Sequence, residues 1–504
     1  MSGSDLAAAR AALEAGQGTV LVRERVADLD TPVGAFLKLT GGAQANAFLL
    51  ESIEGGAARG RYSAIGLAPD LVWRCKGGRA EINRHALSAP HAFEAEAGPA
   101  MDSLRRLIAA ARMPVPPGLP PMAAGLFGYL GYDMVRLIEK LPDTNPDVLG
   151  IPDAVLTRPT LMAVFDHVRD TLTLCAPVWP GGEPGAALEA AEARLDEAEA
   201  ALDRPVPRPA PPAVLPKLAQ PDSNFTEASF IAAVEKAKEY IRAGDVFQVV
   251  PSQRFSVPFA LPPFALYRAL RRINPAPFLV FGDFGGFSVV AASPEILVRC
   301  RDNTVTVRPL AGTRRRGATP EEDRALEAEL LADPKERAEH LMLLDLGRND
   351  VGRVAAIGSV KVTAQFQVER YSQVMHIGSE VQGRLRDGLD ALDAYAAGFP
   401  AGTLTGAPKI RAMEIIEELE PSRRGLYAGG IGYFGADGGM DTCIALRTAL
   451  VKDGVMHVQA GAGVVADSDP KSEYEETKQK ARALFRAAEE AVRFAAGRRE
   501  RGNG

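Results

Sequence analysis

The stretch YAGGIGYFGADGGMDTCIALRTALV, residues 427–451, decides the fold class. Its apolar runs flank the sequence ADGG at 436–439, and such a turn between apolar runs is typical of paired antiparallel strands. The same stretch places glycines at 430, 432 and 435, in the GxGxxG spacing of a dinucleotide-binding loop. That fingerprint needs a strand, a turn and a helix, whereas a second strand follows here. We therefore interpret 427–451 as antiparallel strands and expect no dinucleotide site.

The segments around this stretch predict an α+β fold with antiparallel sheets. Apolar, strand-like runs occupy 246–257, 278–293, 296–310 and 455–467, and most of them are adjacent or separated only by short turns. Helices are expected at 224–245, where apolar residues recur at helical spacing, and at 469–497. Strands that follow one another directly, with helices in blocks, favour α+β over a doubly wound parallel sheet.

Composition shifts divide the chain into three parts. An Ala/Glu-rich helix and a Pro-rich extended segment at 181–222 read as a connector. We expect an N-terminal domain at 18–180, with strands and Gly- or Pro-rich loops, and a C-terminal domain at 223–495 that carries most of the motifs.

The overall composition is that of a soluble globular protein. The chain has 504 residues and a net charge of −6, and no dense basic stripe suggests nucleic acid as a partner. Four widely spaced cysteines form no CxxC pair, so a reducing, cytoplasmic location is expected rather than a disulfide framework. Neither a secretory signal nor an apolar run long enough to span a membrane is visible.

Two predicted helices begin with Asp-Pro and carry extra acidic residues in their first turns. In DPKERAEHLM, 333–342, Asp333 is the expected N-cap, and Glu336 would complete a capping box, which leaves Glu339 without a structural role. The last helix opens DPK at 469–471, and it places Glu473, Glu476 and Lys480 on one face. A solvated helix face is the alternative explanation. Carboxylates from two separate segments also suit Mg²⁺, which prefers oxygen ligands.

Other motifs point to no further chemistry. AGTLTGAPK, 401–409, lacks the spacing of a phosphate-binding P-loop, and ERAEH, 336–340, is not the HExxH of zinc proteases. The sequence contains no GxSxG or GxCxG nucleophile elbow. The run TRRRG at 313–317 is also compatible with a solvated charged loop.

Eight segments of the C-terminal part, in this order, resemble the chorismate-utilising enzymes. The segments are AASPEILVR (291–299), PLAGTRRRG (309–317), DPKERAEHLMLLDLGRNDVGRV (333–354), VERYSQVMH (368–376), GTLTGAPKIRAMEII (402–416), YAGGIGYFG (427–435), DTCIALRTAL (441–450) and QAGAGVVADSDPKSEYEET (459–477). In the N-terminal part, LLESIEGGAARGRYSAIG (49–66) is similar to component I of anthranilate synthases. The resemblance implies two large antiparallel β-sheets packed as a sandwich with helices outside.

The resemblance also implies a metal site and a reaction. Glu339 and Glu473 would hold Mg²⁺, with Glu336 and Glu476 in a second shell, and the metal would bind the ring carboxylate of chorismate. The family adds a nucleophile to the chorismate ring and expels the 4-hydroxyl, which needs a general acid, and Glu295 is the family's candidate. His376 would assist the later elimination of pyruvate; a buried structural histidine is the alternative.

Substrate-binding residues follow from the same resemblance. Arg447 and Tyr433 would bind the enolpyruvyl side, and Gly312 and Thr313 would line the ring. Further contacts are implied for the backbone of Gly461, Ala462 and Gly463, and for the Lys480 side chain.

Three positions indicate which reaction of the family to expect. Isochorismate and salicylate synthases carry an activating lysine where this chain has Gln248, and aminodeoxychorismate synthases commonly carry a nucleophilic lysine where it has Ala311. Thr403 resembles the ammonia-using members. The resemblance therefore implies an anthranilate synthase, a lyase that releases pyruvate in the first step of tryptophan biosynthesis. The alternatives are an aminodeoxychorismate synthase component I of the folate pathway and a catalytically silent homologue that regulates an amidotransferase.

The resemblance finally implies partners and regulation. No glutaminase elbow is present, so a separate glutamine amidotransferase subunit, component II, would supply ammonia within a heterotetramer. L-tryptophan would inhibit by binding to Glu51 and Ser52 of LLES and to Pro277, Phe278 and Leu279 of NPAPFLVF. An ordinary core strand that ends in a turn is the alternative interpretation of FLLES. Ala276 departs from the serine that is common in relatives.

Overall fold

The structure is a computed structural model that describes residues 3–42, 45–54, 58–207, 218–371 and 374–502. Most of the Pro-rich part of the expected connector, 208–217, lies outside these ranges. The helices are α1 (Gly3–Glu14), α2 (Pro32–Thr40), α3 (Ala100–Ala110), η1 (Tyr132–Leu137), α4 (Pro184–Leu202), α5 (Glu227–Arg242), α6 (Pro263–Ile273), α7 (Pro320–Ala332), α8 (Pro334–Gly352), α9 (Ala391–Gly398), η2 (Gly402–Leu404), α10 (Lys409–Leu419) and α11 (Pro470–Gly502).

The strands of the N-terminal half are β1 (Thr19–Val26), β2 (Phe48–Glu51), β3 (Ile53–Glu54), β4 (Ala58–Arg59), β5 (Tyr62–Lys76), β6 (Arg79–Asn83), β7 (Glu94–Ala95), β8 (Gly125–Leu130), β9 (Ala154–Asp166) and β10 (Thr171–Val178). Those of the C-terminal half are β11 (Asp222–Ser223), β12 (Gln248–Val249), β13 (Ser252–Pro258), β14 (Phe278–Asp283), β15 (Phe287–Ser293), β16 (Ile296–Arg301), β17 (Thr304–Val307), β18 (Leu310–Arg315), β19 (Lys361–Arg370), β20 (Val374–Arg384), β21 (Gly406–Ala407), β22 (Gly430–Gly435), β23 (Met440–Ile444), β24 (Thr448–Lys452) and β25 (Val455–Gly461).

The predicted α+β class with antiparallel strands is confirmed. Every strand pairing in the described ranges is antiparallel. The strands expected in two sheets are linked by hydrogen bonds into one network of 21 strands. The hairpin that decided the class is present, because β22 pairs with β23 across the ADGG turn.

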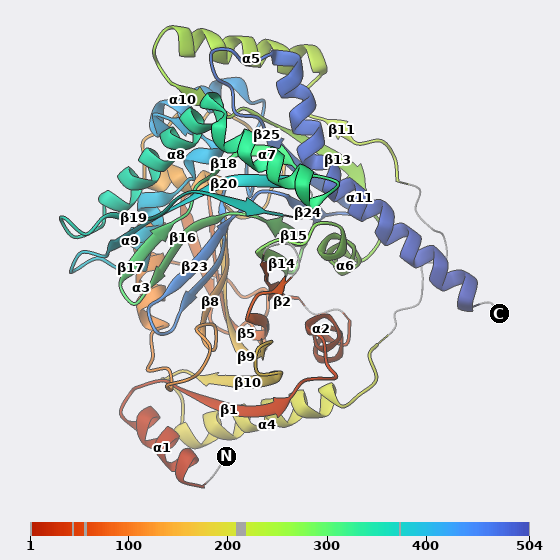
Figure 1. The fold of residues 1–504 in the computed structure, drawn as a ribbon. Coiled ribbons are helices and arrows are strands. Elements are labelled where there is room, and N and C mark those ends of the chain that lie inside the picture. The colour runs from red at the N-terminus through yellow and green to blue at the C-terminus, as the bar shows by residue number, and fades with distance from the viewer. Residues whose placement is uncertain (1–2, 43–44, 55–57, 208–217, 372–373, 503–504) are drawn as a thin grey trace.

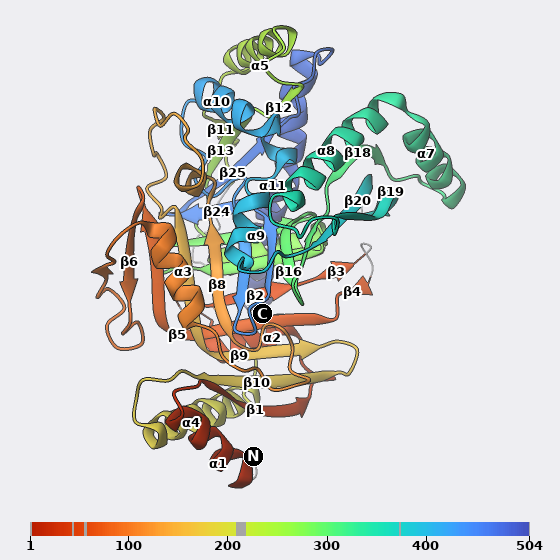
Figure 2. The ribbon, with the colours of Figure 1, turned by 90° about the vertical axis from the view of Figure 1, so that its left-hand side faces the viewer.

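Strands from the two halves of the sequence lie side by side. Strand β2 pairs with β14, so that Glu51 lies opposite Leu279, and β8 pairs with β22. The segment 181–222 therefore separates two halves along the sequence, but strands of both halves belong to one sheet. The boundary between two domains at this segment stays a prediction. Figures 1 and 2 show α1 and α4 at one end of the molecule, beside β1 and β10, and α5, α8 and α10 at the opposite end.

Two large apolar cores lie between the helices and the sheet. One contains Leu195 of α4, Leu270 of α6 and Leu484 of α11, and the other contains Leu104 of α3 and Tyr395 of α9. All four cysteines, Cys75, Cys175, Cys300 and Cys443, are buried and free. None of the helices in the described ranges is both long and apolar enough to cross a membrane.

The two Asp-Pro helix starts agree with the sequence, except for the capping box. Helix α8 begins at Pro334, and the Asp333 side chain accepts hydrogen bonds from the N–H groups of Lys335 and Glu336, as an N-cap does. The reciprocal bond of a capping box is absent, because the Asp333 N–H donates to the Glu329 carbonyl. The Glu336 carboxylate instead lies 2.8 Å from Nη1 of Arg314. The capping-box prediction is therefore wrong, since an arginine from β18 takes the carboxylate.

Candidate active site

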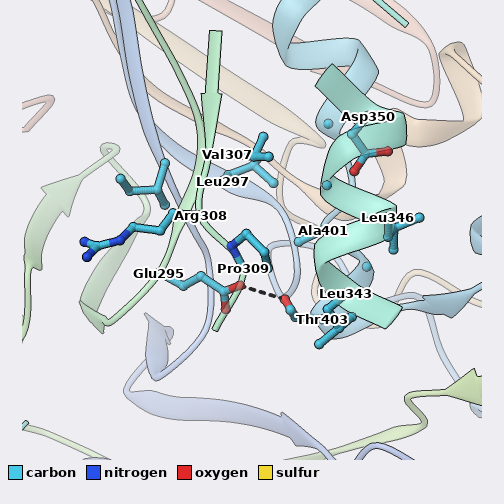
Figure 3. Close-up of a pocket in the computed structure, with 14 residues that line it drawn as sticks. Glu295, Leu297, Val307, Arg308, Pro309, Leu343, Leu346, Asp350, Ala401 and Thr403 are labelled. Carbon is cyan, nitrogen blue, oxygen red and sulfur yellow. Dashed lines mark hydrogen bonds between the residues drawn. The ribbon is translucent and has the colours of Figure 1, made fainter. Parts of the chain in front are cut away.

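Glu295 lies in the turn between β15 and β16, and it is almost completely buried. Its Oε1 atom accepts hydrogen bonds from the Thr403 hydroxyl at 3.2 Å and from the Leu310 N–H at 3.4 Å. Figure 3 shows Glu295 and Thr403 pointing toward each other. Both residues line a cavity of about 30 Å³, which α8 also lines. Burial, opposed only in part by these two donors, raises the pKa of Glu295 to about 8. Glu295 is therefore mainly protonated at neutral pH and can donate a proton.

His376 lies on β20, opposite Glu369 of β19, and its ring faces β18. Its Nδ1 lies 3.1 Å from the Gly312 carbonyl oxygen and 3.0 Å from the Thr313 hydroxyl. Because a carbonyl only accepts, Nδ1 carries the proton of the neutral ring, and Nε2 carries the lone pair. Burial lowers the pKa of His376 to about 4. A neutral imidazole at physiological pH can accept a proton, so the residues include a buried acid, Glu295, and a half-buried base, His376.

Arg447 lies between β23 and β24 in a strained backbone conformation. Its φ angle is 50°, which a non-glycine residue adopts rarely and mostly at functional sites. Burial lowers the pKa of its guanidinium, opposed by the nearby Tyr427, Glu476 and Glu295. A half-buried cation among these groups is suited to bind a carboxylate of a ligand.

The tyrosine beside Arg447 is Tyr427 and not Tyr433. A Cβ atom on Gly461 would lie only 3.0 Å from the Tyr427 hydroxyl, so Tyr427 reaches the glycine segment that was predicted to bind substrate. Tyr433 instead stacks on Phe127 at 5.4 Å between ring centroids, and its hydroxyl lies 3.5 Å from Nη2 of Arg301. The structure thus gives Tyr433, which was predicted to act with Arg447, other partners.

Glu339 of α8 lies against Gln248 of β12 and the glycine segment. Nε2 of Gln248 donates to Oε1 of Glu339 at 3.2 Å. A Cβ atom on Gly463 would lie 2.6 Å from Gln248 Nε2 and 4.0 Å from the same Glu339 oxygen, so only glycine permits this approach. Burial raises the pKa of Glu339, and the charges of Glu336 and Glu476 raise it further, against the effects of Gln248 and Lys480.

Glu473 of α11 belongs to the same electrostatic environment. Burial raises the pKa of its carboxyl, and so does the charge of Glu476, whereas Lys480 lowers it. Lys480 Nζ lies 2.6 Å from Oε1 of Glu476 and donates to the Gly461 carbonyl at 2.9 Å. The first turns of α8 and α11 are therefore brought together around Glu476 and Lys480.

The acidic group fits a hard divalent cation that also has water and substrate oxygens as ligands. Within the described ranges, no three or more His, Cys, Asp or Glu side chains are arranged to hold a metal by themselves. Mg²⁺ commonly takes only one or two carboxylates and keeps several waters. Oε1 of Gln248, next to Glu339, is buried and has no hydrogen-bond partner among these residues. Two half-buried carboxylates and a neighbouring free acceptor are an oxygen-rich site of the kind that Mg²⁺ prefers.

The glycine segment is close to these groups, but one of its amides is already used. The Ala462 N–H donates to the Pro251 carbonyl at 3.1 Å, so it is not free to bind a substrate carboxylate as expected. The arginines of TRRRG are also occupied: Arg314 pairs with Glu336, Arg315 with Glu322 and Arg316 with Asp323. That run connects β18 to α7 and α8 and is not a free charged loop.

A second, larger cavity of about 780 Å³ lies between β2, β14 and β22. Its wall contains all five residues predicted to bind tryptophan: Glu51, Ser52, Pro277, Phe278 and Leu279. Tyr433 and Asp441 also line it. The two segments named in the sequence prediction therefore share one cavity, although more than 200 positions separate Ser52 from Pro277.

The carboxylate of Glu51 is less available in this cavity than expected. Its oxygens accept hydrogen bonds from Nε and Nη2 of Arg271 at 2.9 and 2.8 Å and from the Tyr267 hydroxyl at 2.5 Å. Both partners lie on α6, and Glu51 is buried. Glu51 thus anchors the end of β2 to α6, and a ligand ammonium would have to compete with Arg271.

The chain is similar to known proteins over most of its length. A family model described as chorismate binding enzyme matches residues 58–486. The chain is 59% identical over 493 residues to anthranilate synthase component 1 of Cereibacter sphaeroides, with 97% of this chain and 98% of that protein covered. It is 49% identical to the protein of the same name from Thermus thermophilus, with coverages of 92% and 96%.

Solved structures show the same fold. The crystal structure of anthranilate synthase component I from Streptococcus pneumoniae superposes with a TM-score of 0.74 at 36% identity, and the match covers 91% of this chain and 98% of that one. The menaquinone-specific isochorismate synthase of Escherichia coli superposes with a TM-score of 0.69 at 20% identity, covering 96% and 99% of the two chains. The second likeness concerns the fold alone.

Proposed function

The chain belongs to the chorismate-binding enzymes, and within this family we propose that it is component I of an anthranilate synthase. The proposed reaction converts chorismate and ammonia into anthranilate, pyruvate and water. The observation that carries the proposal is that the chain contains both a buried, protonated Glu295 and a half-buried, neutral His376, and that its relatives bear this name. The reaction needs one group of each kind.

The first half of the reaction uses Glu295 as the general acid. Ammonia forms a bond to ring carbon C2, the double bonds shift, and the C4–O bond breaks. Hydroxide is a poor leaving group, so Glu295 donates its proton and water leaves. Thr403 and the Leu310 N–H hold Oε1, which keeps the other carboxyl oxygen available to carry the proton.

The second half uses His376 as the base. Nε2 of His376 accepts the proton from C2, the bond from C3 to the enolpyruvyl oxygen breaks, and the ring becomes aromatic. The oxygen leaves with the bonding electrons as the enolate of pyruvate, which takes up one proton at its methylene carbon and becomes pyruvate. The Gly312 carbonyl holds Nδ1–H, which fixes the ring with its lone pair on Nε2.

Glu339 and Glu473 would hold Mg²⁺ in this proposal, with Glu336 and Glu476 acting through water. When bound, the ion supplies Lewis-acid stabilisation of the negative charge on the ring carboxylate. Arg447 and Tyr427 would bind the enolpyruvyl carboxylate. Lys480, close to both Glu476 and Gly461, would balance part of the acidic charge.

The residues at the two positions where other family members carry a reactive lysine support ammonia as the nucleophile. Gln248 and Ala311 provide no amine that could activate water or attack chorismate, and Gln248 instead supports Glu339. We propose that a glutamine amidotransferase subunit, component II, delivers ammonia within a heterotetramer in the cytoplasm. The reaction would be the first step of tryptophan biosynthesis.

Feedback by L-tryptophan is part of the same proposal. The large cavity offers the Ser52 hydroxyl and an apolar wall with Pro277 and Phe278, which suits an indole ring. It is separate from the substrate-binding residues Arg447 and Gly461, so inhibition would be allosteric.

Product identification tests the proposed reaction. The purified chain is incubated with chorismate, Mg²⁺ and an ammonium salt, and the products are separated and weighed by mass spectrometry. Anthranilate and pyruvate in equal amounts are expected. Aminodeoxychorismate without pyruvate release, or isochorismate, would assign the chain to another reaction of the family, and no product at all would favour a silent homologue.

A further inference from the structure

The large cavity and the buried acid Glu295 share a wall. Pro294 and Ile296, the two chain neighbours of Glu295, line this cavity. So does Leu310, whose N–H lies 3.4 Å from Oε1 of Glu295. A ligand in the cavity therefore reaches the segments that hold Glu295 without entering the substrate site.

Glu369 of β19 lies in this wall and is held by groups on both sides. The Tyr371 hydroxyl lies 2.9 Å from Oε2 of Glu369 and 3.4 Å from the Pro294 carbonyl, so Tyr371 bridges Glu369 to the residue before Glu295. Nη2 of Arg308 forms an ion pair with Oε1 of Glu369 at 2.9 Å, but it does not satisfy that oxygen as a hydrogen-bond donor. Arg308 and Tyr371 also line the cavity.

The fold leaves space for this carboxylate. A Cβ atom on Gly378 of β20 would lie 2.3 Å from Oε1 of Glu369 and 3.1 Å from the Leu310 side chain. Only glycine at this position lets Glu369 pack beside Leu310. The same central strand carries His376, whose ring contacts Tyr371 at 5.6 Å between centroids.

The charge of Glu369 acts on Glu295. Burial is the largest cause of the raised pKa of Glu295. The negative charge of Glu369 raises that pKa further, whereas the positive charge of Arg447 lowers it. In the described residues, the charged and titratable groups that interact electrostatically with Glu295 are Glu369, Arg447 and Tyr371, and the small cavity beside Glu295 is also lined by Arg308 and Asp350. Of these, Glu369, Tyr371 and Arg308 also face the large cavity.

We propose that Glu369 is a positioning residue through which a ligand in the large cavity acts on Glu295. This inference rests on the proposed function and names how its regulation reaches the acid. A ligand with a carboxylate, as an amino acid has, competes with Glu369 for Arg308. The charge of Glu369 is then less neutralised, Glu295 holds its proton more strongly, and proton donation to the leaving hydroxyl slows.

The test compares Glu369→Gln with wild type and with Glu380→Gln. Glu380 lies on β20 and contacts Thr363 and Gln382, away from this wall, which makes it a matched control. The dependence of kcat on pH is measured at constant free ammonia, with and without tryptophan, and tryptophan binding is measured separately by calorimetry.

In wild type, tryptophan should move the loss of activity at alkaline pH to a higher pH. In Glu369→Gln without tryptophan, the loss of activity at alkaline pH (the alkaline limb of the profile) should begin about one pH unit lower than in wild type, because a like charge beside Glu295 is gone. Tryptophan should still bind, with its affinity changed by no more than about threefold, while its effect on kcat falls to within about twofold, well below a typical allosteric coupling. Tyr371→Phe, which removes the bridge to Pro294, should weaken inhibition in the same direction.

A Glu369→Gln enzyme with the wild-type alkaline limb and full inhibition would overturn the inference. The limb shift is measured without tryptophan, so it tests Glu369 even if wild type proves insensitive to the amino acid. Failure of the proposed function has a different signature, because wild type would then form no anthranilate. If Glu369→Gln does not fold, an unchanged limb and full inhibition in Tyr371→Phe would overturn the inference equally.

Discussion

The Thr403 hydroxyl lies 3.2 Å from Oε1 of Glu295 and holds one oxygen of a carboxyl group that is otherwise almost cut off from water. A carboxyl in this environment keeps its proton at neutral pH. The expected acid of the reaction is thus available in the state it needs before substrate binds.

The first prediction concerns pH. Because Glu295 must be protonated to act, kcat at constant free ammonia should fall as the pH rises through about 8. Because His376 must be neutral, activity should also fall as the pH drops toward about 4. Glu295→Gln should lower kcat by roughly 10²–10⁴-fold at neutral pH, the range typical for loss of a general acid. The measurement is the initial rate at saturating chorismate across pH 7 to 9. A kcat that does not change over this range would show that Glu295 is not the general acid.

The second prediction distinguishes the two tyrosines. Tyr427→Phe should raise the KM for chorismate about tenfold, which corresponds to the loss of one hydrogen bond to a charged group. Tyr433→Phe should alter the response to tryptophan more than the KM, because Tyr433 lines the large cavity. The reverse pattern of KM and inhibition would restore Tyr433 as the partner of Arg447.

The third prediction concerns the metal. Glu339→Gln and Glu473→Gln should each nearly abolish turnover, since each removes a negative charge from a site with few protein ligands. Glu475→Gln is the matched control, because Glu475 lies on the same turn of α11 and pairs with Lys478. Binding of Mn²⁺ as a stand-in, followed by its paramagnetic signal, gives a readout that does not depend on turnover. Wild-type activity and metal binding in either variant would show that the assigned carboxylates are wrong.

The fourth prediction tests the large cavity as the tryptophan site. Ser52→Phe places a bulky ring among Pro277, Phe278 and Leu279, so tryptophan should no longer inhibit. Inhibition is measured for each enzyme relative to its own rate without tryptophan. If Ser52→Phe is inhibited as strongly as wild type, or if millimolar tryptophan leaves wild type unaffected, the cavity is not a regulatory site in this chain.

Local patterns in the sequence predicted the fold class and the helix starts. The Gly-rich turn at 436–439 between apolar runs distinguishes a hairpin from a dinucleotide loop, and the Asp-Pro pairs mark the first residues of α8 and α11. These features depend on a few neighbouring residues, so they are visible without the tertiary structure.

Side-chain partners across the fold could not be predicted in the same way. Glu51 is bound by Tyr267 and Arg271, which lie 216 and 220 positions away on a helix of the other half. The choice between Tyr427 and Tyr433 could not be read from the sequence either, because Tyr427 and Ala428, whose φ angle is 66°, lie in the turn before β22, whereas Tyr433 lies within β22. Alternation along a strand therefore does not relate the two rings. The role of Gln248 beside Glu339 likewise depends on a contact between distant segments.

We propose that this polypeptide makes anthranilate from chorismate with free ammonia. The most direct measurement follows anthranilate fluorescence from the purified chain with chorismate and Mg²⁺, and supplies either an ammonium salt or glutamine. The fluorescence should rise steadily with ammonium, should not rise with glutamine alone, and should hardly rise with Glu295→Gln. Absence of fluorescence with ammonium from a folded wild-type chain, or glutamine-driven synthesis by this chain alone, would contradict the proposal.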